Sequence, residues 1–154
     1  MSAIDLSLPD EAATLSLGER LAPGIGPGRV LHLRGELGTG KTTLARGLLR
    51  ALGLPGRIKS PTYTLVELYP LSSLNLYHFD LYRFKDRTEW LNSGFREYFS
   101  ADSACIVEWP ERAGDLLSPP DLEIALEFDG AARRASLRSH SAAGSSWLSR
   151  LSFS

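Results

Sequence analysis

One segment, Gly35–Thr43, constrains the fold of this chain more than any other, and its sequence is GELGTGKTT. It fits the pattern G-x-x-x-x-G-K-[ST], which binds phosphate when it follows a strand and opens a helix. An apolar run through Val30 and Leu33 predicts the strand, and residues 41–52 have the spacing of an amphipathic helix that stops at Gly53. The sequence therefore predicts a nucleotide-binding α/β protein.

Each residue type in this segment has a physical reason to be there. The glycines let the backbone curl so that successive N–H groups point at phosphate oxygens, and the following helix adds partial positive charge at its first turn. We expect Lys41 to reach the β- and γ-phosphates, the Thr42 hydroxyl to bind Mg²⁺, and Thr43 to contact the α-phosphate. The predicted nucleotide-binding residues of the loop are Gly35, Glu36, Leu37, Gly38, Thr39, Gly40, Lys41, Thr42 and Thr43.

The kind of nucleotide follows by elimination. A guanine-specific GTPase normally carries an [NT]-K-x-D segment that reads the base and a D-x-x-G switch, and the sequence has neither. ATP is therefore the expected nucleotide. A small kinase is an open alternative because kinases share the phosphate-binding loop, although no arginine-rich lid segment is evident.

Strand-like and helix-like patterns alternate along the rest of the chain. This alternation predicts an α/β fold, a P-loop NTPase-like sandwich in which helices flank a mixed, partly parallel central sheet. Residues 1–140 are expected to form a single ATPase domain, and the Ser-rich tail, residues 141–154, either docks as one helical turn or frays. The strands are expected over residues 4–10, 62–69, 75–82, 104–109, 121–128 and 133–139, and the further helices over residues 9–24 and 86–99, the latter interrupted near Gly94.

Two acids lie in apolar surroundings, Asp80 in NLYHFDLY and Glu108 directly after ACIV. Burying an unpaired carboxylate is costly, and the carboxyl ends of strands in an open α/β sheet are where ligands bind. We therefore expect Glu108 to be the metal acid of a P-loop enzyme and Asp80 to position the attacking water or a switch loop. The alternative for either acid is a buried ion pair, such as Asp80 with Arg83.

Two further residues are candidates for the same site. Thr62 and Thr64, in KSPTYTL, lie where a switch loop would lie, so Thr62 could contact Mg²⁺ or sense the γ-phosphate; a hydroxyl at the start of a strand is the alternative. Trp109 is expected at the mouth of the site, where it could stack on a nucleotide or a partner, and an ordinary core tryptophan is the alternative.

Charge and cysteine content narrow the function classes. The formal net charge is −1, so the chain lacks the basic character of an autonomous nucleic-acid-binding domain, and any nucleic acid is expected to be held by a partner. The single cysteine, Cys105, excludes an intramolecular disulfide and reads as a small buried hydrophobe. No run is long and apolar enough to span a bilayer, and the first residues carry acids where a signal peptide would be basic. We expect a cytoplasmic protein without a membrane partner.

Four segments, taken in order and at their spacing, resemble the TsaE family, the ATPases of bacterial tRNA threonylcarbamoyladenosine biosynthesis. They are GELGTGKTT, KSPTYTLVE, YHFDLYR and VEWPER. The similarity extends to LPDEAATLSLGERLA and GFREYF, so it spans roughly residues 5 to 128. A phosphate-binding loop alone would be generic, whereas this combination is specific.

The resemblance implies a small P-loop ATPase that works with two partner proteins, TsaB and TsaD. That assembly transfers a threonylcarbamoyl group onto adenosine 37 of tRNAs that read codons beginning with A. ATP hydrolysis by the TsaE subunit is expected to reset the TsaB–TsaD complex between turnovers and to be stimulated by it. The subunit would meet tRNA only indirectly, through the complex.

The resemblance also carries roles over to particular residues. It assigns phosphate and metal binding to Lys41, Thr42 and Glu108, and it makes Asp80 a required active-site acid and Thr62 part of a switch-I-like loop.

It further places the first helix, around Glu11 and Thr14, beside the base or sugar of the nucleotide. The family loop more often reads G-D-L-G-A-G-K-T, so Glu36 and Thr39 depart from it, at positions where backbone amides do the binding. Besides a Mg²⁺-dependent ATPase, a nucleotide-gated binding module with incidental turnover stays open, because no arginine finger in cis is evident.

Overall fold

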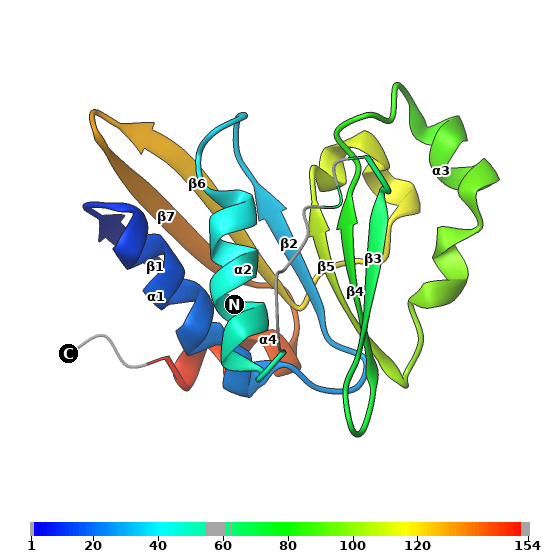
Figure 1. The fold of residues 1–154 in the computed structure, drawn as a ribbon, viewed down its shortest axis with the longest axis horizontal. Helices are drawn as coiled ribbons and strands as arrows, with labels where there is room; N and C mark the ends of the chain where they lie inside the picture. The colour runs from blue at the N-terminus through cyan, green and yellow to red at the C-terminus, as the bar shows by residue number, and fades with distance from the viewer. Residues whose placement is uncertain (1, 55–60, 62, 152–154) are drawn as a thin grey trace.

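The structure is a computed structural model that describes residues 2–54, 61 and 63–151. Its centre is a seven-stranded sheet with the strand order β1-β7-β6-β2-β5-β4-β3 (Figure 1). The strands are β1 (Ala3–Leu8), β2 (Val30–Arg34), β3 (Val66–Pro70), β4 (Asn75–Asp80), β5 (Ser103–Glu108), β6 (Leu122–Asp129) and β7 (Ala132–Ser139). The helices are α1 (Glu11–Leu21), α2 (Lys41–Ala51), α3 (Arg87–Ser93) and α4 (Ala142–Ser149), with short 3₁₀ turns η1 (Ala22–Gly24), η2 (Phe95–Tyr98), η3 (Pro110–Arg112) and η4 (Gly114–Leu116).

The sheet is mixed, which confirms the predicted fold class. Strands β6, β2, β5 and β4 run parallel to one another, so their carboxyl ends meet at one edge, the upper edge in Figure 1. Strands β1 and β7 on one side and β3 on the other pair antiparallel. Side chains at the carboxyl ends of the four parallel strands therefore lie at one edge of the sheet.

One face of the sheet packs against α1, α2 and α4. In Figure 1 the first two of these helices lie in front of β2, β6 and β7. The apolar side chains of this layer alternate along the strands, as in β5, where Ala104 and Ile106 belong to it. The same alternation puts Glu108, and in β4 His78 and Asp80 beyond Leu76, on the face that α2 covers.

The opposite face of β4 and β5 carries a smaller, aromatic core. Phe79 lies at its centre, with ring centroids of Phe99 at 5.2 Å and Trp90 at 6.2 Å. Cys105 is buried on this side, and burial raises the pKa of its thiol to about 12, which fits the prediction of a small buried hydrophobe. On the shared edge, the parallel pairing of β4 with β5 sets Asp80 opposite Glu108.

Several element boundaries differ from the sequence prediction. The hairpin strand predicted from residue 62 begins at Val66, because Leu65 closes a turn by donating its N–H to the Pro61 carbonyl and has φ +70°. Strand β4 ends at Asp80 and β5 at Glu108, so each acid is the last residue of its strand. The interruption predicted near Gly94 is confirmed, since this glycine caps α3 with φ +77°.

The described part of the tail, residues 141–151, docks on the domain through α4. Ser141 caps α4 by accepting the N–H of Gly144, and Trp147 donates its indole N–H to the Leu21 carbonyl at 3.0 Å. Trp147 and Leu148 are both 2% exposed and belong to the main core. Across the described part of the chain, no helix combines the length and apolar character that crossing a bilayer requires.

Candidate functional site

The segment Gly35–Thr43, which we call the P-loop, joins β2 to α2. Its glycines Gly35, Gly38 and Gly40 have φ of +149°, +84° and +109°, which side chains rarely tolerate. A Cβ on Gly35 would also lie 2.6 Å from the Leu126 carbonyl oxygen. The loop thus curls in front of the first turn of α2, whose N-cap, Gly40, supplies no side-chain hydrogen bond. Backbone N–H groups at such a helix start are suited to a phosphate.

Lys41 folds back over this loop. Its Nζ donates to the carbonyl oxygens of Gly35 at 2.6 Å and Glu36 at 3.0 Å, and it lies 4.2 Å from the ring centroid of Trp109. Burial lowers the pKa of the Lys41 ammonium below its ordinary value, and the carboxylates of Glu108 and Asp80 act against that shift. The ammonium is therefore positioned between the loop and the two acids.

Glu108 is the most tightly held acid of the site. It is 2% exposed, and its carboxylate accepts the Thr42 hydroxyl at 3.0 Å to Oε1 and 3.3 Å to Oε2. His78 Nε2 lies 2.7 Å from Oε2. Glu108 thus contacts a buried histidine as well as the P-loop threonine.

This donor set fits the predicted Mg²⁺. A threonine hydroxyl beside a carboxylate offers hard oxygen ligands, and Mg²⁺ is usually held by one or two carboxylates together with substrate phosphates. Thr42 and Glu108 would be its protein ligands. Among the described residues, no group of three or more His, Cys, Asp or Glu side chains could hold a metal ion by itself.

Asp80 lies beside Glu108 with a different set of contacts. It is 4% exposed, and its Oδ1 accepts the Tyr82 N–H at 3.0 Å. Its own N–H donates to the Leu65 carbonyl at 2.9 Å, which ties the strand end to the segment that follows residue 62. Arg83, the partner considered for a structural ion pair, has its guanidinium 4.3 Å from the Tyr63 ring centroid.

Thr62 falls outside the described residues, so its predicted role in a switch loop stays a prediction. Its neighbour Tyr63 is 80% exposed and borders the same cleft as Lys41. Thr64 does not face the cleft, since its hydroxyl donates to Glu67 at 3.1 Å.

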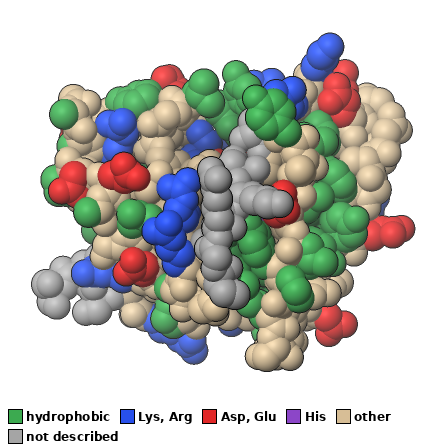
Figure 2. Space-filling view, in the orientation of Figure 1, with side chains coloured by type: hydrophobic (Ala, Val, Ile, Leu, Met, Phe, Trp, Pro, Cys, Tyr) green, Lys and Arg blue, Asp and Glu red, His purple; other side chains and the backbone are tan. Residues whose placement is uncertain are grey.

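Two hollows flank the P-loop. A cleft of about 460 Å³ holds the reactive groups, and exposed hydrophobic side chains such as Tyr63 and Leu37 border it together with Arg83. Figure 2 shows hydrophobic and basic side chains close together along this upper edge of the molecule. The polar groups that the cleft brings together are those of Lys41, Thr42, Thr43, Asp80 and Glu108.

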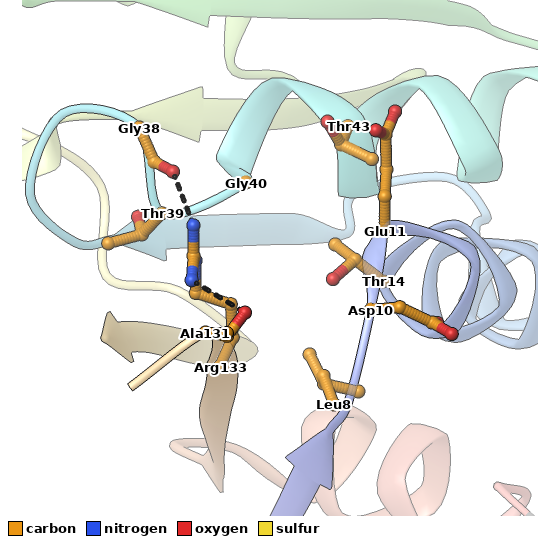
Figure 3. Close-up of a pocket in the computed structure, with 10 residues that line it drawn as sticks. All are labelled: Leu8, Asp10, Glu11, Thr14, Gly38, Thr39, Gly40, Thr43, Ala131 and Arg133. Atoms are coloured by element: carbon orange, nitrogen blue, oxygen red, sulfur yellow. Dashed lines mark hydrogen bonds between the residues drawn. The ribbon is translucent and has the colours of Figure 1, made fainter. Parts of the chain in front are cut away.

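The second hollow, of about 160 Å³, lies on the other side of the loop (Figure 3). Glu11 and Thr14 of α1 line it together with Thr43, which is the arrangement expected for the base or sugar. Gly38, Gly40 and Thr43 of the P-loop line both hollows, so residues predicted for phosphate adjoin the hollow that Glu11 and Thr14 line.

Trp109 is half-buried at the mouth of the cleft, as expected, and does not belong to the interior of either core. Its backbone is left-handed, with φ +59°, which is uncommon for an aromatic residue and typical of strained functional positions. Its ring contacts that of Tyr82 at 4.9 Å, and the Arg112 guanidinium lies 5.6 Å from the ring centroid.

Two residues of the site were missed by the sequence analysis. One is His78, whose contact with Glu108 depends on the register of β4 against β5. The other is Arg133 of β7, which donates to the Gly38 carbonyl at 3.4 Å (Figure 3). Its guanidinium also lies over the Phe128 ring. No local signal marks either contact, since both join segments far apart in sequence.

The chain is similar to proteins of one family. Residues 8–136 match the family model described as threonylcarbamoyl adenosine biosynthesis protein TsaE. A tRNA threonylcarbamoyladenosine biosynthesis protein TsaE from Haemophilus influenzae is 37% identical over 99% of both chains, and its namesake from Bacillus subtilis is 38% identical over 79% of this chain and 75% of its own. The crystal structure of Bacillus subtilis YdiB superposes with a TM-score of 0.82 at 27% identity, covering 97% of this chain and 94% of that one.

Proposed function

This chain belongs to the TsaE family of threonylcarbamoyl adenosine biosynthesis proteins, and from that premise we propose that it is the Mg²⁺-dependent ATP-binding and ATP-hydrolysing subunit of the modification system. It would be required for threonylcarbamoylation of adenosine 37 in tRNAs that read codons beginning with A, and would reset a TsaB–TsaD transfer complex between turnovers. Its partners are TsaB and TsaD, with tRNA contacted only through them, in the cytoplasm.

One observation carries the catalytic part of this proposal. The Thr42 hydroxyl and the Glu108 carboxylate meet at 3.0 Å beside the Lys41 ammonium, at the start of the helix that follows the P-loop. A threonine, a strand-end acid and a lysine in this relation are the parts that P-loop NTPases use to hold a metal and the terminal phosphates.

Each residue of the site would have its own role in ATP hydrolysis. Mg²⁺, when bound, would neutralise charge that develops on the β- and γ-phosphates. Lys41, whose ammonium now donates to the carbonyls of Gly35 and Glu36, would donate to the phosphate oxygens instead. Asp80, adjacent to Glu108 at the strand ends, would orient the attacking water or the segment near Tyr63.

A second candidate, a nucleotide-gated binding module, is favoured by the border of the cleft. Leu37 and Tyr63 are 66% and 80% exposed there, so apolar surface suited to a partner adjoins the phosphate site. Turnover would then be incidental to docking. The two candidates differ in whether hydrolysis, and not occupancy alone, is needed for repeated modification.

Reconstituted tRNA modification with TsaB and TsaD tests this choice. Glu108→Ala should support at most a single round of modification, because the metal acid is lost, whereas Glu127→Ala, an exposed acid of β6, should behave as wild type. ATP hydrolysis by the wild type should be slow alone and rise with the pair. Full multiple-turnover modification by Glu108→Ala would contradict the proposed role of this acid.

The remaining outcomes separate the alternatives. If the TsaB–TsaD pair leaves turnover unchanged while ATP alone controls docking, the binding module is supported. If the γ-phosphate appears on a small acceptor and not in water, the protein is a kinase.

A further inference from the structure

We propose that His78 is a positioning residue that holds the Glu108 carboxylate in the orientation needed for Mg²⁺. This inference rests on the proposed function, because it assigns a role to a side chain that touches the expected metal ligand and not the metal. It concerns a histidine that the assignment of phosphate and metal ligands leaves without a role.

The contact is short and enclosed. His78 Nε2 lies 2.7 Å from Glu108 Oε2, and the two side chains are 1% and 2% exposed. The parallel register of β4 and β5 creates it, since His78 pairs with Ile106 and Asp80 pairs with Glu108. The imidazole therefore lies two residues before the end of β4, on the same face of the sheet as both acids.

Side chains from two elements, α2 and β4, contact the Glu108 carboxylate. Thr42 of α2 donates to Oε1 at 3.0 Å, and Nε2 of His78 in β4 lies 2.7 Å from Oε2. Where the Glu108 carboxyl is ionised it only accepts hydrogen bonds, so that Nε2 then donates in the shorter contact. With Oε2 held by the histidine, Oε1 is left facing the Thr42 hydroxyl, where the two expected metal ligands meet.

The other ring nitrogen argues against a purely structural histidine. Within the part of the chain that the structure describes, Nδ1 of His78 is buried and has no hydrogen-bond partner. A buried polar atom without a partner is costly, so an apolar side chain would suit this position better if packing were its only task. The contact with Glu108 offsets that cost, which supports a functional role for this histidine.

Carboxylates that bind metals are commonly oriented by such neighbours, and removing the neighbour typically lowers metal affinity 10–100-fold. Loss of the His78 donor should therefore weaken Mg²⁺ binding in the nucleotide complex by about 10–100-fold. Nucleotide affinity without Mg²⁺ should change little, because the P-loop amides and Lys41 supply that binding. A structural role would instead lower both affinities together.

The test titrates a fluorescent ATP analogue with and without EDTA, and then titrates Mg²⁺ into the nucleotide complex. His78→Leu should raise the apparent Mg²⁺ dissociation constant about 10–100-fold. His78→Gln, whose amide nitrogen can occupy the place of Nε2, should restore most of the affinity, whereas the shorter His78→Asn should not. His32→Leu is the matched control, a buried histidine of β2 on the opposite face.

Wild-type Mg²⁺ affinity in a folded His78→Leu protein would overturn the proposal. If that variant does not fold, Gln and Asn variants with equal Mg²⁺ affinity would overturn it equally. If the wild-type protein itself shows no Mg²⁺-dependent nucleotide binding, the proposed function is overturned. If the wild type shows this binding and the His78 variants keep it, only the role of His78 is overturned.

Discussion

Asp80 and Glu108 are register partners at the carboxyl ends of the adjacent parallel strands β4 and β5. Both side chains are buried, and the Lys41 ammonium interacts favourably with both carboxylates. Their contacts differ, because Glu108 accepts from Thr42 and His78 while Asp80 accepts from the Tyr82 N–H. The contact of Glu108 with Thr42 supports the proposal that Glu108 is the metal acid and that Asp80 acts on the water or the neighbouring segment.

The first prediction concerns Asp80→Asn. The amide retains an oxygen that can accept the Tyr82 N–H, so the strand end and ATP affinity should persist, with a change of less than about 1 kcal/mol in binding. The lost charge should reduce kcat by about 10²–10⁴-fold if the acid acts on the attacking water. Calorimetric ATP binding and phosphate release with TsaB and TsaD present measure the two effects.

Asp129→Asn, an exposed acid at the end of β6, is the control and should match wild type. Weakened ATP binding together with a lower melting temperature in Asp80→Asn would instead establish the structural reading of this acid.

The second prediction uses Trp109 as a reporter. Trp90 and Trp147 are 1% and 2% exposed, whereas Trp109 is half-buried with the Lys41 ammonium over its ring. ATP with Mg²⁺ should draw Lys41 to the phosphates, and tryptophan emission should change for that reason. Trp109→Phe should abolish the change but keep a ring beneath Lys41, so ATP affinity should shift by less than about 1 kcal/mol. An unaltered emission change in this variant would show that Trp90 or Trp147 is the reporter and would contradict the prediction.

Much of the fold could be predicted because its signals are local. The P-loop pattern fixes a strand, a turn and a helix within one stretch of chain, and apolar runs that end in an acid predict strand ends that carry functional groups. Asp80 and Glu108 are the last residues of β4 and β5 as a result. Strand order then brings both acids to the edge where α2 begins.

What the sequence could not predict depends on register and on distant contacts. The hydrogen bond between His78 and Glu108 requires the parallel register in which His78 pairs with Ile106, and no local sequence pattern specifies that register. Arg133 reaches Gly38 across 95 positions of the chain. The start of β3 shifted to Val66 because hydrogen bonding from Leu65 favours a turn over the strand propensity of the preceding residues.

The third prediction concerns the close approach of α1 and α2. A Cβ on Gly47 would lie 2.2 Å from the Leu15 carbonyl oxygen, a backbone atom that cannot move aside alone. Gly47→Ala should therefore destabilise the protein by about 2–3 kcal/mol, although alanine favours a helix by about 1 kcal/mol. Denaturant unfolding measures this, and Gly26→Ala is the control, since a Cβ there has no neighbour within 4 Å and should change stability by less than about 0.5 kcal/mol. Equal stability of the two variants would mean that the helices can separate without cost.

The last prediction concerns His32 and pH. Burial lowers the pKa of its imidazole from 6.5 to about 4, with Arg34 acting in the same direction and Glu123 against it. The unfolded chain therefore binds more protons than the folded one between these values, so the stability contributed by the neutral ring is complete above pH 6.5 and is lost as the pH falls toward 4.

Between pH 7.5 and 5 this loss should be on the order of 2 kcal/mol, at 1.36 kcal/mol for each pH unit below 6.5. Denaturant unfolding at pH 7.5, 6 and 5 should show this slope in the wild type and a shallower one in His32→Leu, which has no ring to protonate. The pKa of Glu123 is lowered from 4.5, so that carboxylate loses its contribution at pH values below this window. The same slope in both proteins would mean that His32 is protonated within the folded state and that other groups set the pH dependence.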